Sequence, residues 1–262
     1  MITTSNNGKV RKILQLQKKA KLRREERVFI VEGPKMYEEL PTERIESVFV
    51  SESFYRNPEN KQLLCKYAYE VVKDAVFADM SDTKNPQGIL AVAAQYRYVL
   101  KDLFPKNRPP FLLVLDTIQD PGNLGTMLRS GEAAGITGVI MNQETVDIYN
   151  PKVIRSTMGS LYRVPFFITE DLAGTLQQVK AEGVTLFAAH LQGKKNYDAC
   201  GYENGCGFLI GNESGGLSEE VASMADTYIR IPMAGKVESL NAAAAAAVLM
   251  FEAARQRRQI EK

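Results

Sequence analysis

The sequence is poor in the residues from which metal, disulfide and acid–base sites are built: its 262 residues include three cysteines and one histidine. Cys65, Cys200 and Cys206 are odd in number and widely spaced, so we expect no disulfide framework and a reducing, cytoplasmic setting. Their spacing, with His190 added, fits no common zinc finger or ribbon, so we expect no metal. A single histidine also gives little support to histidine-based acid–base catalysis.

Long apolar runs are lacking as well. No stretch approaches the roughly 20 apolar residues of a membrane span, and the first residues form no hydrophobic signal region. The composition, 45% hydrophobic and 24% charged, is that of an ordinary globular protein. We therefore expect a protein without a membrane segment, organised as two domains or one large one.

The glycine-rich fingerprints of nucleotide-binding folds are also missing. The nearest match, Gly205, Gly207 and Gly211, has one residue too many before its last glycine, and it precedes a strand instead of following one. The chain contains no P-loop. These absences argue against the common nucleotide and dinucleotide folds.

Positive charge is concentrated near the start of the chain. Residues 9–27 include nine lysines and arginines and only two glutamates, although the net charge of the whole chain is only +2. Apolar residues at helical spacing among them predict an amphipathic helix whose charged face needs only solvent. The same density of cations suits a phosphate backbone. The candidates for such contacts are Lys18, Lys19, Arg23 and Arg24.

Alternating segments predict a small α/β domain over residues 1–100. Its strands are expected at 27–31, 44–50, 69–72 and 88–94, with helices around 33–40 and 57–68. Residues 101–110 contain three prolines, four charges and no periodicity, which predicts an extended linker. Residues 111–262 are expected to form a second domain.

The second domain is predicted to be a parallel sheet with helices on both faces. Its strands are expected at 111–116, 137–141, 184–190, 207–211 and 227–231. Ligands of such sheets bind outside the carboxyl ends of the strands. That edge is where Glu213 and the 232–241 loop should lie.

The first of three informative segments follows the strand expected at 111–116. Composition predicts a turn over 119–122 and a helix from Asn123 to near Gly135. Asn123 and Arg129 are six residues apart, more than a turn and a half of helix. They share one groove only if the backbone between them bends.

The other two informative segments are loops that lead into helices. Residues 207–211 should run as a strand into a loop with Glu213, after which Ser218 caps the next helix. Ser239 and Asn241 stand at the mouth of a long alanine-rich helix. Their side chains suit helix capping, and the same position suits a cradle for a polar ligand.

Together, the three segments resemble the three motifs of the SpoU (TrmH-type) RNA ribose 2′-O-methyltransferases. The pattern Asp-Pro-x-Asn-x-Gly-x3-Arg is met by Asp120, Pro121, Asn123, Gly125 and Arg129. The pattern Gly-x-Glu-x-x-Gly is met by Gly211, Glu213 and Gly216. The pattern Ile-Pro-Met-x-Gly-x3-Ser-Leu-Asn is met by Ile231, Pro232, Met233, Gly235, Ser239, Leu240 and Asn241.

The resemblance implies an S-adenosylmethionine-dependent enzyme that methylates a ribose 2′-hydroxyl of RNA. It also implies a SPOUT catalytic domain with a trefoil knot, and a homodimer. The implied catalytic residues are Asn123, Arg129, Glu213, Ser239 and Asn241. The implied cofactor residues are Gly211, Ile231, Met233 and Leu240. Asn123 and Glu213 would orient Arg129, which acts either as a general base or, since a guanidinium holds its proton strongly, as an electrostatic clamp.

The first domain resembles the substrate-binding domain, related to ribosomal protein L30e, that precedes the catalytic domain in many members of this family. Its landmarks are the turn at 31–33 and the segment 81–87 before the last strand. A reader of structured RNA favours ribosomal (23S) RNA as substrate; the alternatives are transfer RNA and a non-catalytic RNA-binding protein of the same fold. Lys152 and Arg155 are either further phosphate contacts or plain surface charge.

Overall fold

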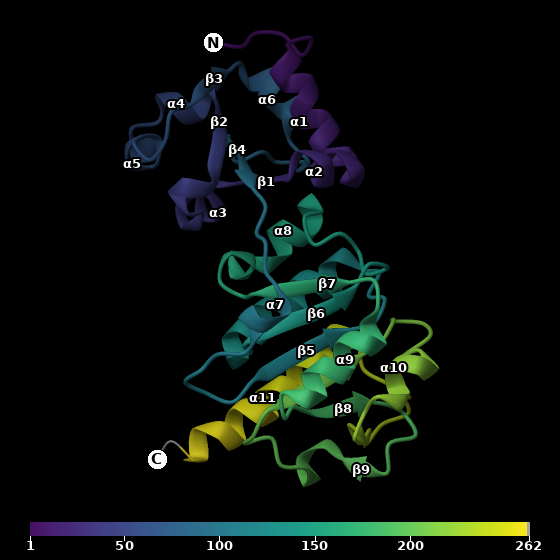
Figure 1. The fold of residues 1–262 in the computed structure, drawn as a ribbon. Helices are drawn as coiled ribbons and strands as arrows, with labels where there is room; N and C mark the ends of the chain where they lie inside the picture. The colour runs from purple at the N-terminus through teal and green to yellow at the C-terminus, as the bar shows by residue number, and fades with distance from the viewer. Residues whose placement is uncertain (261–262) are drawn as a thin grey trace. The chain divides into compact units, whose positions relative to one another are not determined.

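The computed structural model describes residues 1–260 and forms two compact units (Figure 1). The first unit consists of residues 1–97 together with 147–162, and the second of residues 98–146 together with those from 163 onward. The sequence alone assigned 147–162 to the second domain. These residues instead pack with the N-terminal unit, although their neighbours on both sides belong to the other one.

The sheet of the first unit has the strand order β1–β4–β2–β3. Strand β4 runs antiparallel to both β1 and β2, and β3 runs parallel to β2. All four predicted strands are confirmed, at Val28–Glu32 (β1), Ile45–Ser51 (β2), Glu70–Val72 (β3) and Ile89–Ala94 (β4). The β1 and β4 strands are almost completely buried because they are apolar on both sides.

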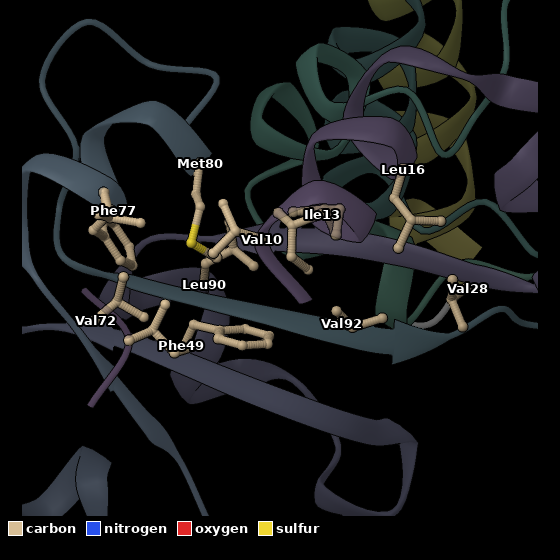
Figure 2. Packing of buried hydrophobic residues seen from close by; sticks show 13 residues of the cluster. Val10, Ile13, Leu16, Val28, Phe49, Val72, Phe77, Met80, Leu90 and Val92 are labelled. Atoms are coloured by element: carbon tan, nitrogen blue, oxygen red, sulfur yellow. The ribbon is translucent and has the colours of Figure 1, made fainter. Parts of the chain in front are cut away.

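The predicted amphipathic helix is α1 (Gly8–Lys18). Its buried residues Val10, Ile13 and Leu16 pack in one core with Met80 of α6 (Asp74–Met80), against the sheet (Figure 2). The other helices of this unit are α2 (Ala20–Glu26), α3 (Pro34–Glu39), α4 (Glu52–Arg56) and α5 (Lys61–Leu64), with 3₁₀ turns at Thr42–Arg44 (η1) and Pro58–Asn60 (η2).

The helix expected at 57–68 is broken into η2 and α5. Local side-chain bonds divert its backbone. Asn57 accepts a bond from the Glu59 N–H at 3.0 Å, and Asn60 donates to the carbonyl of Phe54 at 2.9 Å.

Residues 147–162 contain α8 (Pro151–Thr157) and the 3₁₀ turn η4 (Ser160–Tyr162). Specific polar contacts explain why they belong to the first unit. The guanidinium of Arg23 binds the carboxylate of Asp147 through two nitrogens, at 3.1 and 2.5 Å. The Tyr149 hydroxyl accepts from the backbone N–H of Tyr96 at 2.8 Å and donates to its carbonyl at 3.2 Å.

The second unit is built on a seven-stranded parallel sheet with the order β7–β6–β5–β10–β8–β11–β9. The five predicted strands are confirmed at Phe111–Leu115 (β5), Gly138–Asn142 (β6), Thr185–Ala189 (β8), Cys206–Ile210 (β10) and Thr227–Arg230 (β11). The edge strands β7 (Phe166–Thr169) and β9 (Lys195–Asn196) were missed. Both are too short to give a clear pattern.

Helices cover both faces of this sheet, as predicted (Figure 1). On one face α9 (Leu172–Ala181) and α10 (Glu219–Ser223) share a core with β5, β8 and β10. On the other, α7 (Pro121–Ala134) packs against α11 (Ala242–Ile260), which also contacts β10. The trefoil knot stays a prediction.

The segment 101–110 is not extended along its whole length. It begins with the 3₁₀ turn η3 (Leu100–Leu103), and Leu103 is completely buried. A Cβ on Gly138 would lie 2.2 Å from Cγ of Leu103, so Leu103 occupies the space that this glycine leaves. The apolar Leu103 therefore ties the start of the segment to the second unit.

Candidate active site

The first motif forms the start of α7. The helix begins at Pro121, so the prediction that it starts at Asn123 is wrong by two residues. Proline suits this first position because it has no N–H to leave unpaired. Asp120 is the N-cap and accepts a bond from the Asn123 N–H at 2.8 Å. The predicted end is confirmed, since Gly135 closes the helix at a φ of 84°.

A chain of side-chain hydrogen bonds joins all three motifs. Asn241 donates from its amide to the side-chain oxygen of Asn123 at 3.0 Å. Asn123 in turn donates to the carboxylate of Glu213 at 2.9 Å. The Glu213 carboxylate also accepts from the backbone N–H groups of Gln119 and Asp120, each at 3.2 Å. The three loops are thus held together at one point.

The pKa of Glu213 lies below its usual value. Partial burial works in the opposite direction, but bonds from the Asn123 side chain and from backbone N–H groups, including those of Gln119 and Asp120, outweigh it. The carboxylate is therefore ionised at neutral pH and serves as an acceptor for these donors.

The loop after β10 folds back tightly on itself. Asn212 and Gly216 exchange two backbone bonds of 2.9 Å, and the Asn212 side chain accepts from the N–H groups of Ser214 and Gly215. A Cβ on Gly211 would lie 2.1 Å from the carbonyl carbon of Gly216. Only glycine fits at position 211.

A buried aspartate binds the end of this loop, and it was not among the residues predicted from the sequence. Asp116, 5% exposed, accepts from both the N–H and the hydroxyl of Ser218, at 2.8 and 2.7 Å. Its other oxygen accepts from the side-chain amide of Asn142 at 3.0 Å. An aspartate that ends an apolar strand was the available signal, because buried carboxylates need partners.

A cavity of about 800 Å³ opens beside this loop. Its walls are residues that follow β8, β10 and β11, so it lies at the carboxyl ends of the strands, as predicted. The lining includes all four candidate cofactor residues and two of the candidate catalytic residues: Gly211, Ile231, Met233, Leu240, Glu213 and Ser239.

His190 also lines the cavity, at the end of β8. Its Nδ1 accepts from the N–H of Gln192 at 3.1 Å, and its ring stacks against Tyr228 at 5.1 Å. These contacts hold the His190 ring in the wall of the cavity.

Arg129 is exposed on α7, and no hydrogen bond or ion pair engages it anywhere in the part of the chain that the structure describes. In a continuous helix it lies about 9 Å along the axis from Asn123. Asn123 and Glu213 bind each other, and their expected role in orienting Arg129 stays a prediction.

Asn241 is the N-cap of α11. Its side-chain oxygen accepts from the N–H groups of Ala243 and Ala244, at 2.9 and 3.3 Å. The expected capping role is thus confirmed for Asn241, whose amide remains available for Asn123. Ser239 is exposed and has no hydrogen bond among residues 1–260.

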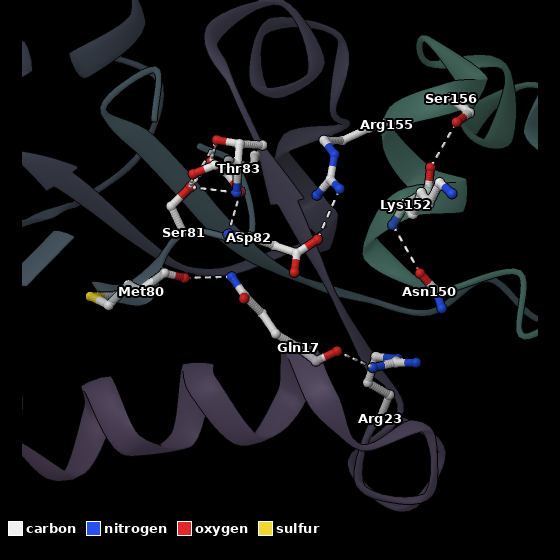
Figure 3. Close-up of polar contacts among 11 residues, drawn as sticks. Gln17, Arg23, Met80, Ser81, Asp82, Thr83, Asn150, Lys152, Arg155 and Ser156 are labelled. Carbon is white, nitrogen blue, oxygen red and sulfur yellow. Dashed lines mark hydrogen bonds and ion pairs between the residues drawn. The ribbon is translucent and has the colours of Figure 1, made fainter. Parts of the chain in front are cut away.

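Arg23 must be removed from the candidate RNA contacts. Arg23 is 2% exposed, and its guanidinium donates to the carbonyl of Gln17 at 3.0 Å (Figure 3). It also donates to the carbonyl of Leu16 at 2.6 Å and to the carboxylate of Asp147. Its donors are therefore already satisfied inside the first unit. Lys18, Lys19 and Arg24 are exposed and make no ion pair in the described residues.

The remaining candidates, Lys152 and Arg155, lie on α8 (Figure 3). Arg155 binds the carboxylate of Asp82 at 2.8 Å, whereas the Lys152 side chain is exposed and makes no ion pair among residues 1–260. Through α8, both belong to the N-terminal unit and not to the unit with the cavity.

Among residues 1–260, every helix is too short or too polar to span a membrane. The same residues contain no cluster of three or more histidine, cysteine, aspartate or glutamate side chains that could hold a metal ion. Cys65, Cys200 and Cys206 are free thiols.

Comparison with known proteins finds matches to both parts of the chain. Residues 110–251 match the SpoU rRNA Methylase family, and residues 7–91 match the MRM3-like substrate binding domain. Over 251 residues the chain is 31% identical to the 23S rRNA (guanosine(2553)-2′-O)-methyltransferase RlmP of Bacillus subtilis, which covers 95% of this chain and 97% of the relative.

Solved structures match along nearly the whole chain. An AdoMet-bound rRNA methyltransferase from Sinorhizobium meliloti is 32% identical, with a TM-score of 0.85 and 97% of each chain covered. The SpoU methyltransferase AviRb from Streptomyces viridochromogenes, in complex with AdoMet, is 26% identical, with a TM-score of 0.86 and coverage of 97% and 99%. The chain therefore belongs to the SpoU rRNA methylase family.

Proposed function

We propose that this protein transfers the methyl group of S-adenosylmethionine to a ribose 2′-hydroxyl of 23S ribosomal RNA. The observation that carries the proposal is the hydrogen-bond chain Asn241–Asn123–Glu213, which brings three distant motifs to the rim of one cavity. The substrate follows from the B. subtilis relative, which is named for 23S ribosomal RNA and matches along both domains.

The cavity fits S-adenosylmethionine. Its volume of about 800 Å³ lies within the usual range for small-molecule sites. Ile231, Met233 and Leu240 offer apolar surface for an adenosyl group, and the tight turn at Gly211 presents backbone groups instead of a side chain. When bound, the cofactor supplies an electrophilic methyl group on a sulfonium.

Glu213, Asn123 and Asn241 fix the shape of the site. They hold the turn before α7, the loop after β10 and the start of α11 in one arrangement, which limits the motion of the cavity wall. None of the three needs to exchange a proton for this role. Ser239, exposed at the cavity rim, is available to bind the ribose.

Arg129 acts as an electrostatic clamp on the RNA. A guanidinium holds its proton strongly, which opposes its use as a base, and the exposure of Arg129 leaves its donors available. It would bind a phosphate beside the target and stabilise the negative charge that develops on the 2′-oxygen as the proton leaves.

The protein would act as a homodimer in the cytoplasm. The apolar side chain of Phe251 on α11 is 44% exposed, and Ala244 on the same helix is exposed, so α11 offers surface for a second copy. Three free thiols suit a reducing compartment. Lys18, Lys19, Arg24 and Lys152 would contact the RNA backbone from the substrate-binding domain.

The test is methyl transfer from labelled S-adenosylmethionine to total RNA that lacks the modification, with wild type and Arg129→Ala run in parallel. We expect label in 23S-sized RNA, with one linkage made resistant to alkali. We expect no such label with Arg129→Ala. Label in transfer RNA would overturn the substrate but keep the reaction. No label, from protein that still binds RNA, would favour a non-catalytic RNA-binding protein.

A further inference from the structure

A second cavity, of about 410 Å³, lies within the N-terminal unit. It is formed by the start of α3, the segment from the end of β2 to η2, and the loop before β4. No lysine, arginine, aspartate or glutamate is among its lining residues. The polar lining consists of hydroxyls and carboxamides, from Ser51, Ser53, Asn57, Asn60 and Gln87.

Gly88 lines this cavity, and Gly33 directly precedes its lining residue Pro34. Gly33 and Gly88 have φ angles of +100° and +80°, a conformation that other residues rarely adopt. A Cβ on Gly88 would lie 2.7 Å from Cβ of Phe54 and 2.8 Å from Oγ of Ser51. The Ser51 N–H also donates to the Gly88 carbonyl at 2.8 Å. The loop backbone therefore lies directly on the floor of the cavity.

The beginning of the same loop is anchored as well (Figure 3). Glu32, only 8% exposed, accepts from the hydroxyls of Ser81 and Thr83 and from the N–H of Asp82. Asp82 is held in turn by Arg155 at 2.8 Å. With both ends of the loop fixed, Gln87 projects from a preorganised backbone.

Several hydrogen-bonding groups in this cavity have no partner among residues 1–260. Neither end of the Gln87 carboxamide makes a side-chain bond. Asn57 uses only its oxygen, on the Glu59 N–H, which leaves its NH₂ available. Asn60 uses only its NH₂, on the Phe54 carbonyl, which leaves its oxygen available. The lining thus offers both donors and acceptors.

We propose that this cavity binds an unpaired nucleobase of the RNA substrate, with the carboxamides of Asn57 and Gln87 bonded to its edge. Nucleobases are neutral, flat and carry adjacent donors and acceptors, and RNA-binding proteins recognise them where they are unstacked. Pro34 and Pro86 provide apolar walls for the ring. A phosphate group is a poor match because the lining holds no cation. The inference rests on the proposed RNA substrate.

A titration of the full-length protein tests the proposal. The 5′-monophosphates of uridine, cytidine, adenosine and guanosine are added separately, and NMR follows the amide signals of Gly88 and the side-chain NH₂ signals of Asn57 and Gln87. We expect at least one nucleotide to shift these signals saturably, and ribose 5-phosphate to leave them unchanged. Equal shifts with ribose 5-phosphate would indicate a phosphate site and overturn the proposal, as would no shift with any nucleotide.

Variants then separate base recognition from folding. Gln87→Leu removes no bond within the protein, and Asn57→Asp keeps the acceptor for Glu59 while it removes the donor. Each should weaken the strongest nucleotide about three- to tenfold, the usual effect of one lost hydrogen bond. Asn6→Leu, at an exposed asparagine outside the cavity, should bind as wild type does. Equal affinity in all four proteins would overturn the proposal.

Failure of this inference is distinguishable from failure of the proposed function. Label transfer from S-adenosylmethionine to RNA by the wild-type protein tests the second unit and requires no nucleotide in this cavity. Methyl transfer without nucleotide shifts would refute the nucleobase site alone. Nucleotide shifts without methyl transfer would refute the proposed reaction alone.

Discussion

The side-chain amide of Asn123 donates to the carboxylate of Glu213 across 90 residues of sequence, at 2.9 Å. Because Asn241 donates to the same Asn123 at 3.0 Å, one asparagine joins the loop after β10 to the start of α11. The arrangement explains why these residue types are needed. A carboxamide is both donor and acceptor, so Asn123 can connect a carboxylate on one side with an amide on the other.

Removal of this central residue should loosen all three loops. Asn123→Ala is expected to lower the free energy of unfolding by about 1–3 kcal/mol, since it removes a donor to an ionised carboxylate. Chemical denaturation measures the change. Asn241→Ala combined with Asn123→Ala should show a coupling of at least about 0.5 kcal/mol. Strictly additive effects would mean that the two asparagines act independently.

Glu213 should make stability depend on pH in acid. Its pKa in the folded protein is lowered, so its contribution is fully present above its ordinary value of 4.5 and is lost as pH falls through the folded value. The stability difference between wild type and Glu213→Gln should therefore shrink as pH falls from 7 into this range. Thermal unfolding at a series of pH values measures it, and a constant difference would contradict the lowered pKa.

Arg129 should matter for the reaction and not for folding. Arg129→Ala is expected to reduce methyl transfer about 10²- to 10³-fold, the usual effect of removing one electrostatic stabiliser. Its stability should stay within about 0.5 kcal/mol of wild type because the side chain is exposed and makes no hydrogen bond or ion pair among residues 1–260. Arg258→Ala, an exposed arginine on α11, is the matched control. Equal activity in both variants would exclude the clamp.

The basic N-terminal segment contains two kinds of cation, which should respond differently to substitution. Arg23→Ala leaves Asp147 without its partner, and we expect a loss of about 3 kcal/mol in stability. Replacement of Lys18, Lys19 and Arg24 by alanine should leave stability nearly unchanged and flatten the salt dependence of RNA affinity. Fluorescence anisotropy at several salt concentrations measures the slope. An unchanged slope would mean that these three residues do not contact the RNA backbone.

Deletion of residues 1–27 would not make this distinction. Val10, Ile13 and Leu16 are almost completely buried in the core of the first unit. Their removal would expose the sheet that α1 covers, so weaker RNA binding would reflect unfolding.

Much of the fold could be predicted because its strands are apolar on both sides. Phe111–Leu115 and Cys206–Ile210 are continuous buried runs bounded by turn residues, and such runs are clear in sequence. The strand Lys195–Asn196 pairs with β11 through two residues. A strand this short has no hydrophobic pattern from which it could be predicted. The placement of 147–162 depends on contacts such as Arg23–Asp147, which join residues 124 apart.

The candidate site was predictable in its members and less so in its contacts. Motif spacing brought Gly211, Ile231, Met233 and Leu240 to one cavity. It gave no indication that Asn123 would bind Asn241, or that the Arg129 side chain would make no hydrogen bond or ion pair among residues 1–260. Those facts depend on side-chain directions, which change by about 100° per residue along a helix.

A single arginine near the end of α11 should stabilise the second unit. Arg257 donates to the carbonyls of Tyr202, Pro109, Pro110 and Asn204, and its guanidinium lies 4.6 Å from the ring centre of Phe111. Arg257→Ala should cost about 2–4 kcal/mol, because several carbonyls lose a charged donor at once. Arg257→Lys should recover little, since an ammonium cannot reproduce the planar fork. Thermal unfolding beside Arg258→Ala measures both, and full recovery by lysine would show that charge alone matters.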